Sequence, residues 1–193
     1  MDFRELDRRA LLVLDKIVAA ATPADLARPT PCTGWTLADL LRHQVSENHA
    51  FAAAARDGSA PDWDGGDLGD DAYAAYQASV DDFLDAIADD AVLDRRLTIN
   101  HFGTFPGTVA LHMHLVDTVA HGWDLARTLG LPYEPDAEAV DAALRLAERI
   151  PAEGREVNGS FARRVDVPPD ASELDRFLAL LGRDPAWTLS RPR

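Results

Sequence analysis

The chain has 193 residues, 47% of them hydrophobic, and it carries a formal net charge of −14 with a pI near 4.6. This length and composition fit one globular domain with a buried core, and no stretch approaches the roughly 18 uninterrupted apolar residues of a membrane span. A surface this acidic repels nucleic acid and anionic membranes, so neither is an expected partner. The first residues mix charges with apolar side chains instead of forming the continuous apolar run of a secretory signal, which predicts a cytoplasmic location.

Six segments have apolar residues at the spacing of amphipathic helices. Thr36 followed by Asp39 indicates a helix start with an approximate capping box, and Ser172 is a candidate cap for the last helix. Gly130, closely followed by Pro132, is the expected end of the fourth helix. The predicted helices cover residues 3–20, 36–57, 70–90, 107–129, 136–150 and 172–182. Long helices joined by loops predict an all-α antiparallel bundle.

The segments between these helices are predicted to be loops or extended chain. Residues 27–35 are broken by prolines and a glycine, and residues 59–70 are rich in Gly, Asp and Pro. The aspartates of the second loop do not match the calcium-binding EF-hand pattern, so a solvated acidic loop is the preferred interpretation. Residues 97–107 are expected to form an extended link, and residues 161–168 alternate like a short strand.

A narrow polar line runs along the otherwise apolar helix predicted over residues 107–129. On a helical wheel at about 100° per residue, its four members fall within about 80° of one another. They are His114, Asp117, His121 and Asp124. Such a line is ordinarily the solvent face of a surface helix. Solvent faces elsewhere in this chain are made of Asp, Glu and Arg, whereas here His recurs with Asp at one-turn spacing, as in a ligand site.

Asp117 and His121 are four residues apart, so both side chains can reach one point beside the helix. A carboxylate oxygen and an imidazole nitrogen there make a two-ligand half-site for a divalent metal. A third ligand must come from another helix, and His43 in the predicted second helix is the candidate. The alternative role of His43 is a core histidine hydrogen-bonded to a neighbour. His49 points to a different face of the same helix.

Three segments of the chain form a recognisable set, and in chain order they read TPCTGWTLADLLRHQV, DTVAHGWDLARTLG and FLALLGRDPAW. Together they resemble a family of small metal-binding proteins related to the N-terminal domain of mycothiol-dependent maleylpyruvate isomerase, within the DinB-like superfamily, and the resemblance covers nearly the whole chain. It implies a single DinB-like domain built on an antiparallel four-helix bundle. In this interpretation residues 1–132 form the bundle core, and residues 133–193 form a small C-terminal extension with a short strand-like segment and helices.

The resemblance also implies a metal site with one histidine from the second helix and an acid-x-x-x-His pair from the later helix. Carried over to this sequence, the ligands are His43, Asp117 and His121. In the isomerase the acid looks like Glu, so the shorter Asp117 must lie closer to the ion or reach it through water. The expected ion is zinc, with nickel or another transition metal as alternatives. Three more residues are candidates for orienting the ligands or for extra coordination, namely Glu47, His114 and Asp124.

Three protein ligands leave one coordination position open, which is typical of catalytic zinc sites. The resemblance implies a small-molecule substrate there, with a low-molecular-weight thiol such as mycothiol as the candidate. No segment resembles the second domain of the isomerase, so we do not expect its substrate to carry over.

Two classes of function follow. One is a metal-dependent thiol S-transferase or isomerase, and the other is a metal- or ligand-binding module without turnover. A site closed by His114 or Glu47 as a fourth ligand would favour the module. A second copy of the chain, forming a homodimer, is a further candidate partner.

Cys32 is the only cysteine, which excludes an intrachain disulfide and zinc sites built from several cysteines. It lies in a loop just before the second helix, where a helix N-terminus can activate a thiol. A lone cysteine is more often a small buried apolar residue. The sequence leaves both roles open.

Overall fold

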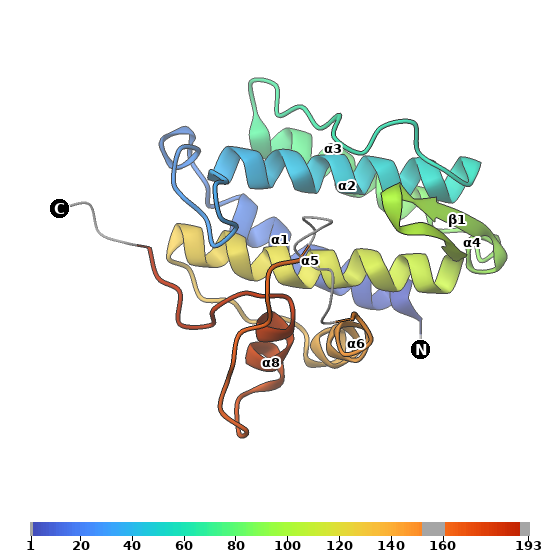
Figure 1. Ribbon diagram of the computed structural model, residues 1–193. Coiled ribbons are helices and arrows are strands. Elements are labelled where there is room, and N and C mark those ends of the chain that lie inside the picture. Colours follow the sequence, from blue (N-terminus) through green and yellow to red (C-terminus); the bar gives the residue numbers. More distant parts are fainter. Residues whose placement is uncertain (1, 152–160, 190–193) are drawn as a thin grey trace.

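The computed structural model describes residues 2–151 and 161–189, which form a mostly helical fold with one small sheet (Figure 1). The long helices are α1 (Phe3–Val18), α2 (Leu37–Asp57), α3 (Ala72–Ala86) and α5 (Gly107–Leu129). The shorter elements are η1 (Pro23–Asp25), α4 (Ala91–Asp94), β1 (Arg96–Ile99), η2 (Asn100–Phe102), β2 (Gly103–Pro106), α6 (Ala137–Ala147) and α8 (Glu173–Leu180). The predicted all-α bundle with a small C-terminal extension is confirmed. Within the described ranges, no helix combines the length and the apolar character needed to cross a lipid bilayer.

The predicted caps begin and end the helices. Thr36 Oγ1 accepts a hydrogen bond from the backbone N–H of Asp39, whose carboxylate accepts in return from the backbone N–H of Thr36. These two bonds complete the capping box at the start of α2. Ser172 Oγ accepts from the backbone N–H of Asp175 at the start of α8. α5 ends at Gly130, whose φ of 71° lies in the left-handed region that favours glycine.

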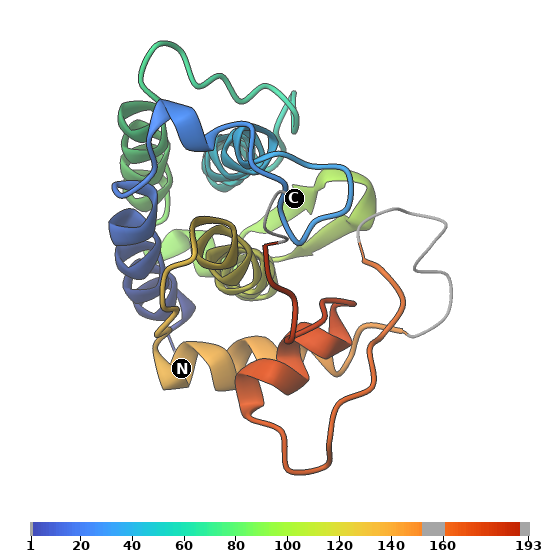
Figure 2. The ribbon, with the colours of Figure 1, turned by 90° about the vertical axis from the view of Figure 1, so that its left-hand side faces the viewer.

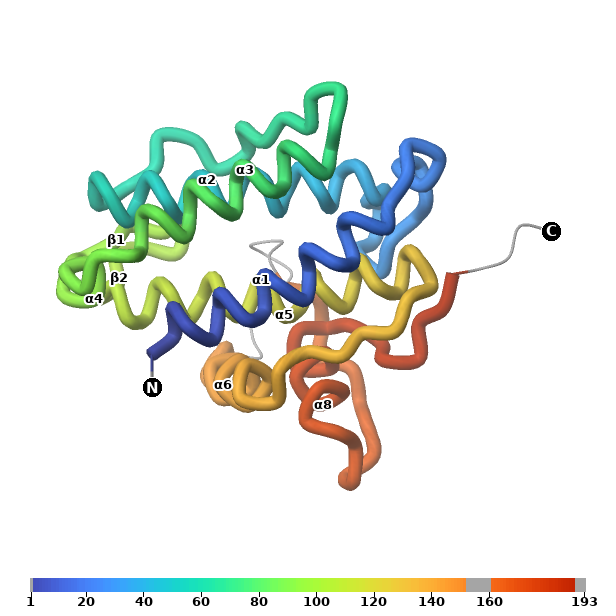
Figure 3. The backbone as a smooth tube through the Cα atoms, turned by 180° about the vertical axis from the view of Figure 1, so that it is seen from behind, coloured from blue at the N-terminus to red at the C-terminus, as the bar shows by residue number. Residues whose placement is uncertain are grey.

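The four long helices form a bundle, which Figure 2 shows nearly end-on. α1 and α5 run in one direction, and α2 and α3 run in the other (Figures 1 and 3). α2 and α3 are parallel because the loop of residues 58–71 returns the chain to the end of the molecule where α2 begins. The antiparallel relation expected of bundle neighbours holds for α2 against α5, and this pair of helices carries the predicted ligands.

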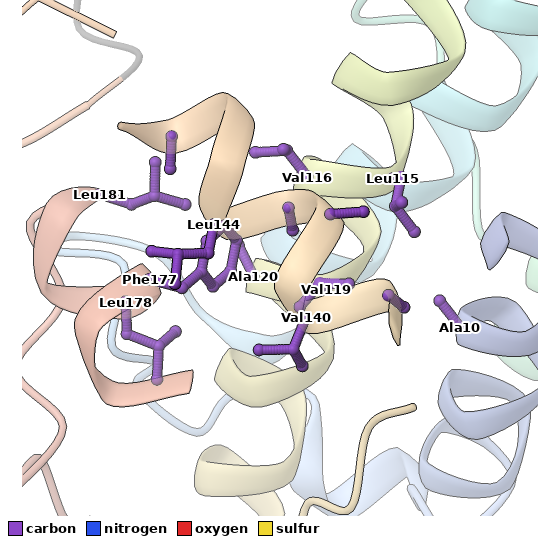
Figure 4. Close-up of a cluster of buried hydrophobic side chains, with 14 of the residues drawn as sticks. Ala10, Leu115, Val116, Val119, Ala120, Val140, Leu144, Phe177, Leu178 and Leu181 are labelled. Atoms are coloured by element: carbon purple, nitrogen blue, oxygen red, sulfur yellow. The ribbon is translucent and has the colours of Figure 1, made fainter. Parts of the chain in front are cut away.

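α5 is the central helix, because its side chains enter all three clusters of buried apolar residues. Near its start it packs against residues of α2, α3 and β1, and near its end it packs against α1 and α2. Its middle packs against α6 and α8 (Figure 4) through Leu115, Val116, Val119, Ala120 and Trp123. A helix covered on so much of its circumference buries polar as well as apolar side chains.

The two strands lie where the sequence predicts only an extended link. They pair antiparallel, with Leu97 opposite Phe105 and Thr98 opposite Thr104. Asn100 turns the chain between them with a φ of 40°. Each strand has only four residues, so its sequence is too short for the alternation that identifies a strand.

The strand-like segment predicted over residues 161–168 is not a strand, and this prediction was wrong. The backbone N–H of Val165 instead donates to the carbonyl of Ala179 on α8 at 3.0 Å. Alternation makes a strand only where a partner edge is available, and in the described part of the chain the sheet consists of β1 and β2. The helix predicted over residues 70–90 is also shorter, because α3 ends at Ala86 and α4 is a separate turn.

Candidate metal site

α2 and α5 bring the predicted ligands together because they are antiparallel neighbours. A step forward along α2 is therefore matched by a step back along α5. Asn48 on α2 lies beside His114 on α5. Closer to the start of α2, His43 lies beside Asp117 and His121, which are further along α5.

One carboxylate oxygen is the meeting point of the three predicted ligands. Asp117 Oδ1 lies 3.3 Å from His43 Nε2 and 3.3 Å from His121 Nε2. One donor atom from each residue lies within 4.8 Å of the other two. Ligand atoms around a tetrahedral zinc ion, with bonds of about 2.0–2.1 Å, are separated by about 3.3 Å. The two nitrogens and the oxygen therefore fit such an ion in type and spacing, and metal binding itself stays a prediction.

A neighbour that the sequence analysis missed orients the Asp117 carboxylate. Gln44 is buried, and its Nε2 donates to Asp117 Oδ2 at 2.8 Å. With Oδ2 occupied in this way, Oδ1 is the oxygen that faces both imidazoles. Gln44 directly follows His43, so its place beside the predicted histidine was the available signal.

The donor atoms lie at the edge of the core rather than deep within it. The side chains of His43 and Asp117 are 23% and 25% exposed, and that of His121 is 10% exposed. The indole of Trp35 forms one wall, with its ring centroid 5.1 Å from that of His43 and 6.3 Å from that of His121. The donor atoms therefore belong to partly exposed side chains beside an aromatic ring.

A carboxyl group lies near the Nδ1 atom of each histidine, on the side of the ring away from Asp117. His121 Nδ1 donates to Asp124 Oδ2 at 2.9 Å. His43 Nδ1 faces Glu47 Oε1 at 4.0 Å, which is beyond direct hydrogen-bonding distance. A carboxylate in this position fixes the ring and leaves Nε2 for a metal. Asp124 makes this contact with His121, whereas Glu47 lies near His43 without a direct hydrogen bond, and an orienting role for either residue stays a prediction.

Asp124 is also the centre of a second polar cluster, which the sequence analysis did not predict. The guanidinium of Arg183 donates to both of its oxygens, from Nε to Oδ1 at 3.1 Å and to Oδ2 at 3.0 Å, and from Nη2 to Oδ2 at 2.7 Å. The Cys32 thiol donates to Oδ2 at 3.3 Å. Cys32, His121 and Asp124 have donor atoms close enough to hold an ion. Because Arg183 already occupies the carboxylate, a cation there would lie against a positive charge, so this cluster supports His121 rather than forming a second metal site.

His114 lies outside both clusters, because its hydrogen-bond partners are not the predicted ligands. Its Nδ1 is 2.8 Å from Asp7 Oδ2 and its Nε2 is 3.0 Å from Asn48 Oδ1. Asn48 Nδ2 donates to Ser79 Oγ, which donates to the carbonyl of Tyr76. That chain of donors turns the amide oxygen of Asn48 toward His114, so both imidazole nitrogens are engaged inside the core.

The polar line of α5 is not a solvent face. Measured over the whole residue, His114, His121 and Asp124 are 1%, 7% and 0% exposed. Solvent exposure was the ordinary explanation for such a line, and this burial excludes it. Buried polar groups are costly unless they are partnered, and here each one is held by residues from another part of the chain.

The charged side chains of the site strongly shift one another's pKa values. Burial alone would raise the pKa of Asp117, but the adjacent His121 and His43 hold that pKa well below its usual range. Burial alone would lower the pKa of His121, but Asp117 and Asp124 hold it well above its usual value. In the metal-free protein His121 is therefore a cation between two carboxylates, and a metal ion would replace its proton on Nε2.

The two orienting carboxyl groups differ in charge state. Burial, reinforced by the negative charge of Asp117, raises the pKa of Glu47 to about 9. Burial also acts to raise the pKa of Asp124, but Arg183 and His121 outweigh it and lower that pKa to about 2. Asp124 is thus the carboxylate that stays ionised behind its histidine.

The comparisons with known proteins agree with this fold. A family model described as "Mycothiol maleylpyruvate isomerase N-terminal domain" matches residues 8–126, which contain all three predicted ligands and more than half of the chain. The chain belongs to this family. The predicted relation to the mycothiol-dependent isomerases is thereby confirmed.

Solved structures and curated relatives extend the likeness. The crystal structure of the mycothiol-dependent maleylpyruvate isomerase has a TM-score of 0.61 and 16% identity, and that of a mutant has 0.60 and 14%. Each alignment covers 75% of this chain and 66% of the isomerase chain, slightly less than two thirds. Uncharacterized proteins from two Mycobacterium tuberculosis strains, CDC 1551 / Oshkosh and ATCC 25618 / H37Rv, are 28% identical over 186 residues, covering 95% of this chain and 98% of theirs.

Proposed function

We propose that this chain binds a divalent transition metal ion, with zinc the expected ion, through His43 Nε2, Asp117 Oδ1 and His121 Nε2. The observation that carries the proposal is the convergence of both Nε2 atoms on Asp117 Oδ1 at 3.3 Å. The Asp124 carboxylate behind the His121 ring and the membership of the isomerase family support it.

We further propose that the site takes a low-molecular-weight thiol of the mycothiol type and serves thiol transfer or thiol-assisted isomerisation. A bound divalent cation supplies the stabilisation of thiolate over thiol that this chemistry needs. The chain's own residues then have distinct tasks. Asp124 holds the His121 ring, Gln44 holds Asp117, and the half-buried Trp35 shields one side of the site from water.

The second candidate function is a metal- or ligand-binding module without turnover. That function would be favoured by a fourth protein ligand closing the site. His114 is engaged by Asp7 and Asn48, and Glu47 faces the outer nitrogen of His43. The ligand set therefore stays at three residues, which supports an open site and hence the enzyme.

Cobalt substitution tests both parts of the proposal. Cobalt-loaded protein should gain sulfur-to-cobalt charge-transfer absorption in the near ultraviolet when mycothiol or a simple thiol analogue is added. The band should be lost in His121→Ala and kept in His49→Ala. It should also be kept in Cys32→Ser, because the added thiol and not the protein's own sulfur is the proposed source. A spectrum that does not change at millimolar thiol would remove the chemical basis of thiol transfer and favour the binding module.

A further inference from the structure

Arg183 joins the C-terminal segment to the candidate metal site. Its side chain is 13% exposed and pairs with Asp124, which is fully buried. The three guanidinium hydrogen bonds to Asp124 are all shorter than 3.2 Å, and they engage both carboxylate oxygens. Asp124 in turn accepts from His121 Nδ1 at 2.9 Å. An unbroken series of hydrogen bonds therefore runs from the segment after α8 to a predicted ligand on α5.

The fold fixes the position from which Arg183 reaches Asp124. Gly182 has a φ of +84°, in the left-handed region, and a Cβ there would lie 2.6 Å from the Cβ of Ala162. The N–H of Arg183 donates back to the carbonyl of Leu178 at 2.9 Å, which closes the end of α8. α8 is itself anchored on α6 and α5 (Figure 4) through Phe177, Leu178 and Leu181.

We infer that Arg183 is a positioning residue for the proposed metal site, and that through Asp124 it fixes the imidazole of His121. The C-terminal segment thereby sets the metal affinity of a site whose ligands all lie on α2 and α5. This inference rests on the proposed function. A bidentate guanidinium holds a carboxylate in one plane and one orientation, which a single ammonium group does not.

Two effects of removing Arg183 oppose each other, so the sign of the change is informative. Loss of a positive charge near the site would by itself strengthen the binding of a divalent cation. Loss of orientation would weaken it, because removing a group that holds a ligand typically costs about 10–100-fold in metal affinity. Arg183 and Asp124 are paired at hydrogen-bonding distance, so their charges largely cancel at the site. Orientation is therefore the dominant effect, and affinity should fall.

The test is the dissociation constant for zinc, measured by competition with a chromophoric chelator on the full chain. Arg183→Gln should weaken binding about tenfold or more, and Arg183→Lys should weaken it less but measurably. Arg176→Gln is the matched control. Arg176 lies on α8, close to Arg183 in the sequence, but pairs with Glu148 at an exposed position. Its affinity should stay within about twofold of wild type.

A double-mutant cycle shows whether Arg183 acts through Asp124. In an Asp124→Asn background, Arg183→Gln should have little further effect on zinc affinity, because the group that it acts through is already changed. Independent effects of the two substitutions would overturn the inference. An unchanged affinity in Arg183→Gln would also overturn it by showing that Arg183 has no influence, and a tighter affinity would do so by showing that its charge dominates. A wild-type affinity in Arg183→Lys would overturn it as well, since a positive charge without the planar guanidinium would then suffice.

Further measurements distinguish a loss of fold, a failure of the proposed function and a failure of this inference. Far-UV circular dichroism and the thermal midpoint of each metal-free variant identify any loss of fold, and Arg183→Lys decides the question if Arg183→Gln does not fold. Wild-type protein that binds no zinc at micromolar concentration would overturn the proposed function together with this inference. Wild-type binding with no change in any Arg183 variant would overturn the inference alone.

Discussion

Asp117 determines the geometry of the candidate site at the scale of single residues. One of its oxygens faces both histidines and the other is held by Gln44. The carboxylate thus links α2 to α5 while remaining 25% exposed. The Asp117 carboxylate favours the protonated imidazole of His121 in the metal-free protein, and a metal cation would take the place of that proton.

Replacing either proposed histidine ligand should abolish tight zinc binding. His43→Ala and His121→Ala each remove one of three ligand atoms and leave a two-ligand half-site. His49→Ala is the matched control, because His49 lies on the same helix but contacts Asp82 on α3. Equilibrium dialysis followed by elemental analysis measures the effect. Equal loss in all three variants, or in none, would refute the ligand assignment.

Zinc affinity should rise with pH and should continue to rise above pH 6.5, the ordinary pKa of histidine. The neighbouring carboxylates raise the pKa of His121 despite its burial, so the proton on Nε2 competes with the metal up to that raised pKa. Below it, affinity should fall by about tenfold per pH unit for each proton displaced. Chelator competition between pH 5.5 and 9 measures this slope. A flat profile would mean that no histidine contacts the ion.

The sequence predicts the local part of the site and misses the part made by long-range packing. Asp117 and His121 are separated by one helical turn, so their spacing alone places them together. Arg183 and Asp124 are 59 residues apart, and no local pattern relates them. Cys32 contacts Asp124 across 92 residues, and this contact depends on how the loop before α2 packs against α5.

At the scale of helices and strands, the periodicity and caps predict where most helices lie, but they do not predict how the helices pair. The polar line of α5 shows the difference. His121 faces the site with α2, whereas His114, seven positions earlier and on the same side, faces α1 and the far half of α2 through Asp7 and Asn48. Residues on one line of the helical wheel therefore belong to two different groups, the candidate metal site and the buried network around His114. The short strands were missed because their pairing, and not their sequence, defines them.

The buried network around His114 should be structural and separable from the metal site. His114→Leu leaves Asn48 Oδ1 without a donor and removes the imidazole from the buried Asp7, so we expect a loss of about 3 kcal/mol in the free energy of unfolding. Urea denaturation measures this loss. His49→Leu, at an exposed position, should change the same quantity by less than about 1 kcal/mol.

Zinc affinity distinguishes this structural role from a ligand-orienting one. In folded His114→Leu protein, studied at low temperature, zinc affinity should stay within about threefold of wild type, well short of the 10–100-fold cost of losing an orienting group. A larger loss would show that the network does orient the ligands.

At the scale of the whole molecule, the site joins two halves of the bundle. α1 and α5 run one way and α2 and α3 the other, and His43 belongs to the second pair whereas Asp117 and His121 belong to the first (Figure 1). The C-terminal extension packs on the outer side of α5 and adds Arg183 from there. The family match ends at residue 126, before this extension begins, so Arg183 lies outside the matched region.

Metal loading should therefore stabilise the whole fold. The three ligands come together only when α2 and α5 are packed, because the unfolded chain retains just the weak pair of Asp117 and His121 on one segment. Free zinc buffered at about 100 times the dissociation constant should then raise the free energy of unfolding by about 2.7 kcal/mol. Urea denaturation with and without buffered zinc measures the gain. His49→Ala should show all of it, and His43→Ala should show none at the same free zinc. An equal gain in His43→Ala would place the bound metal elsewhere on this acidic protein, and would contradict the proposal that the metal links α2 to α5.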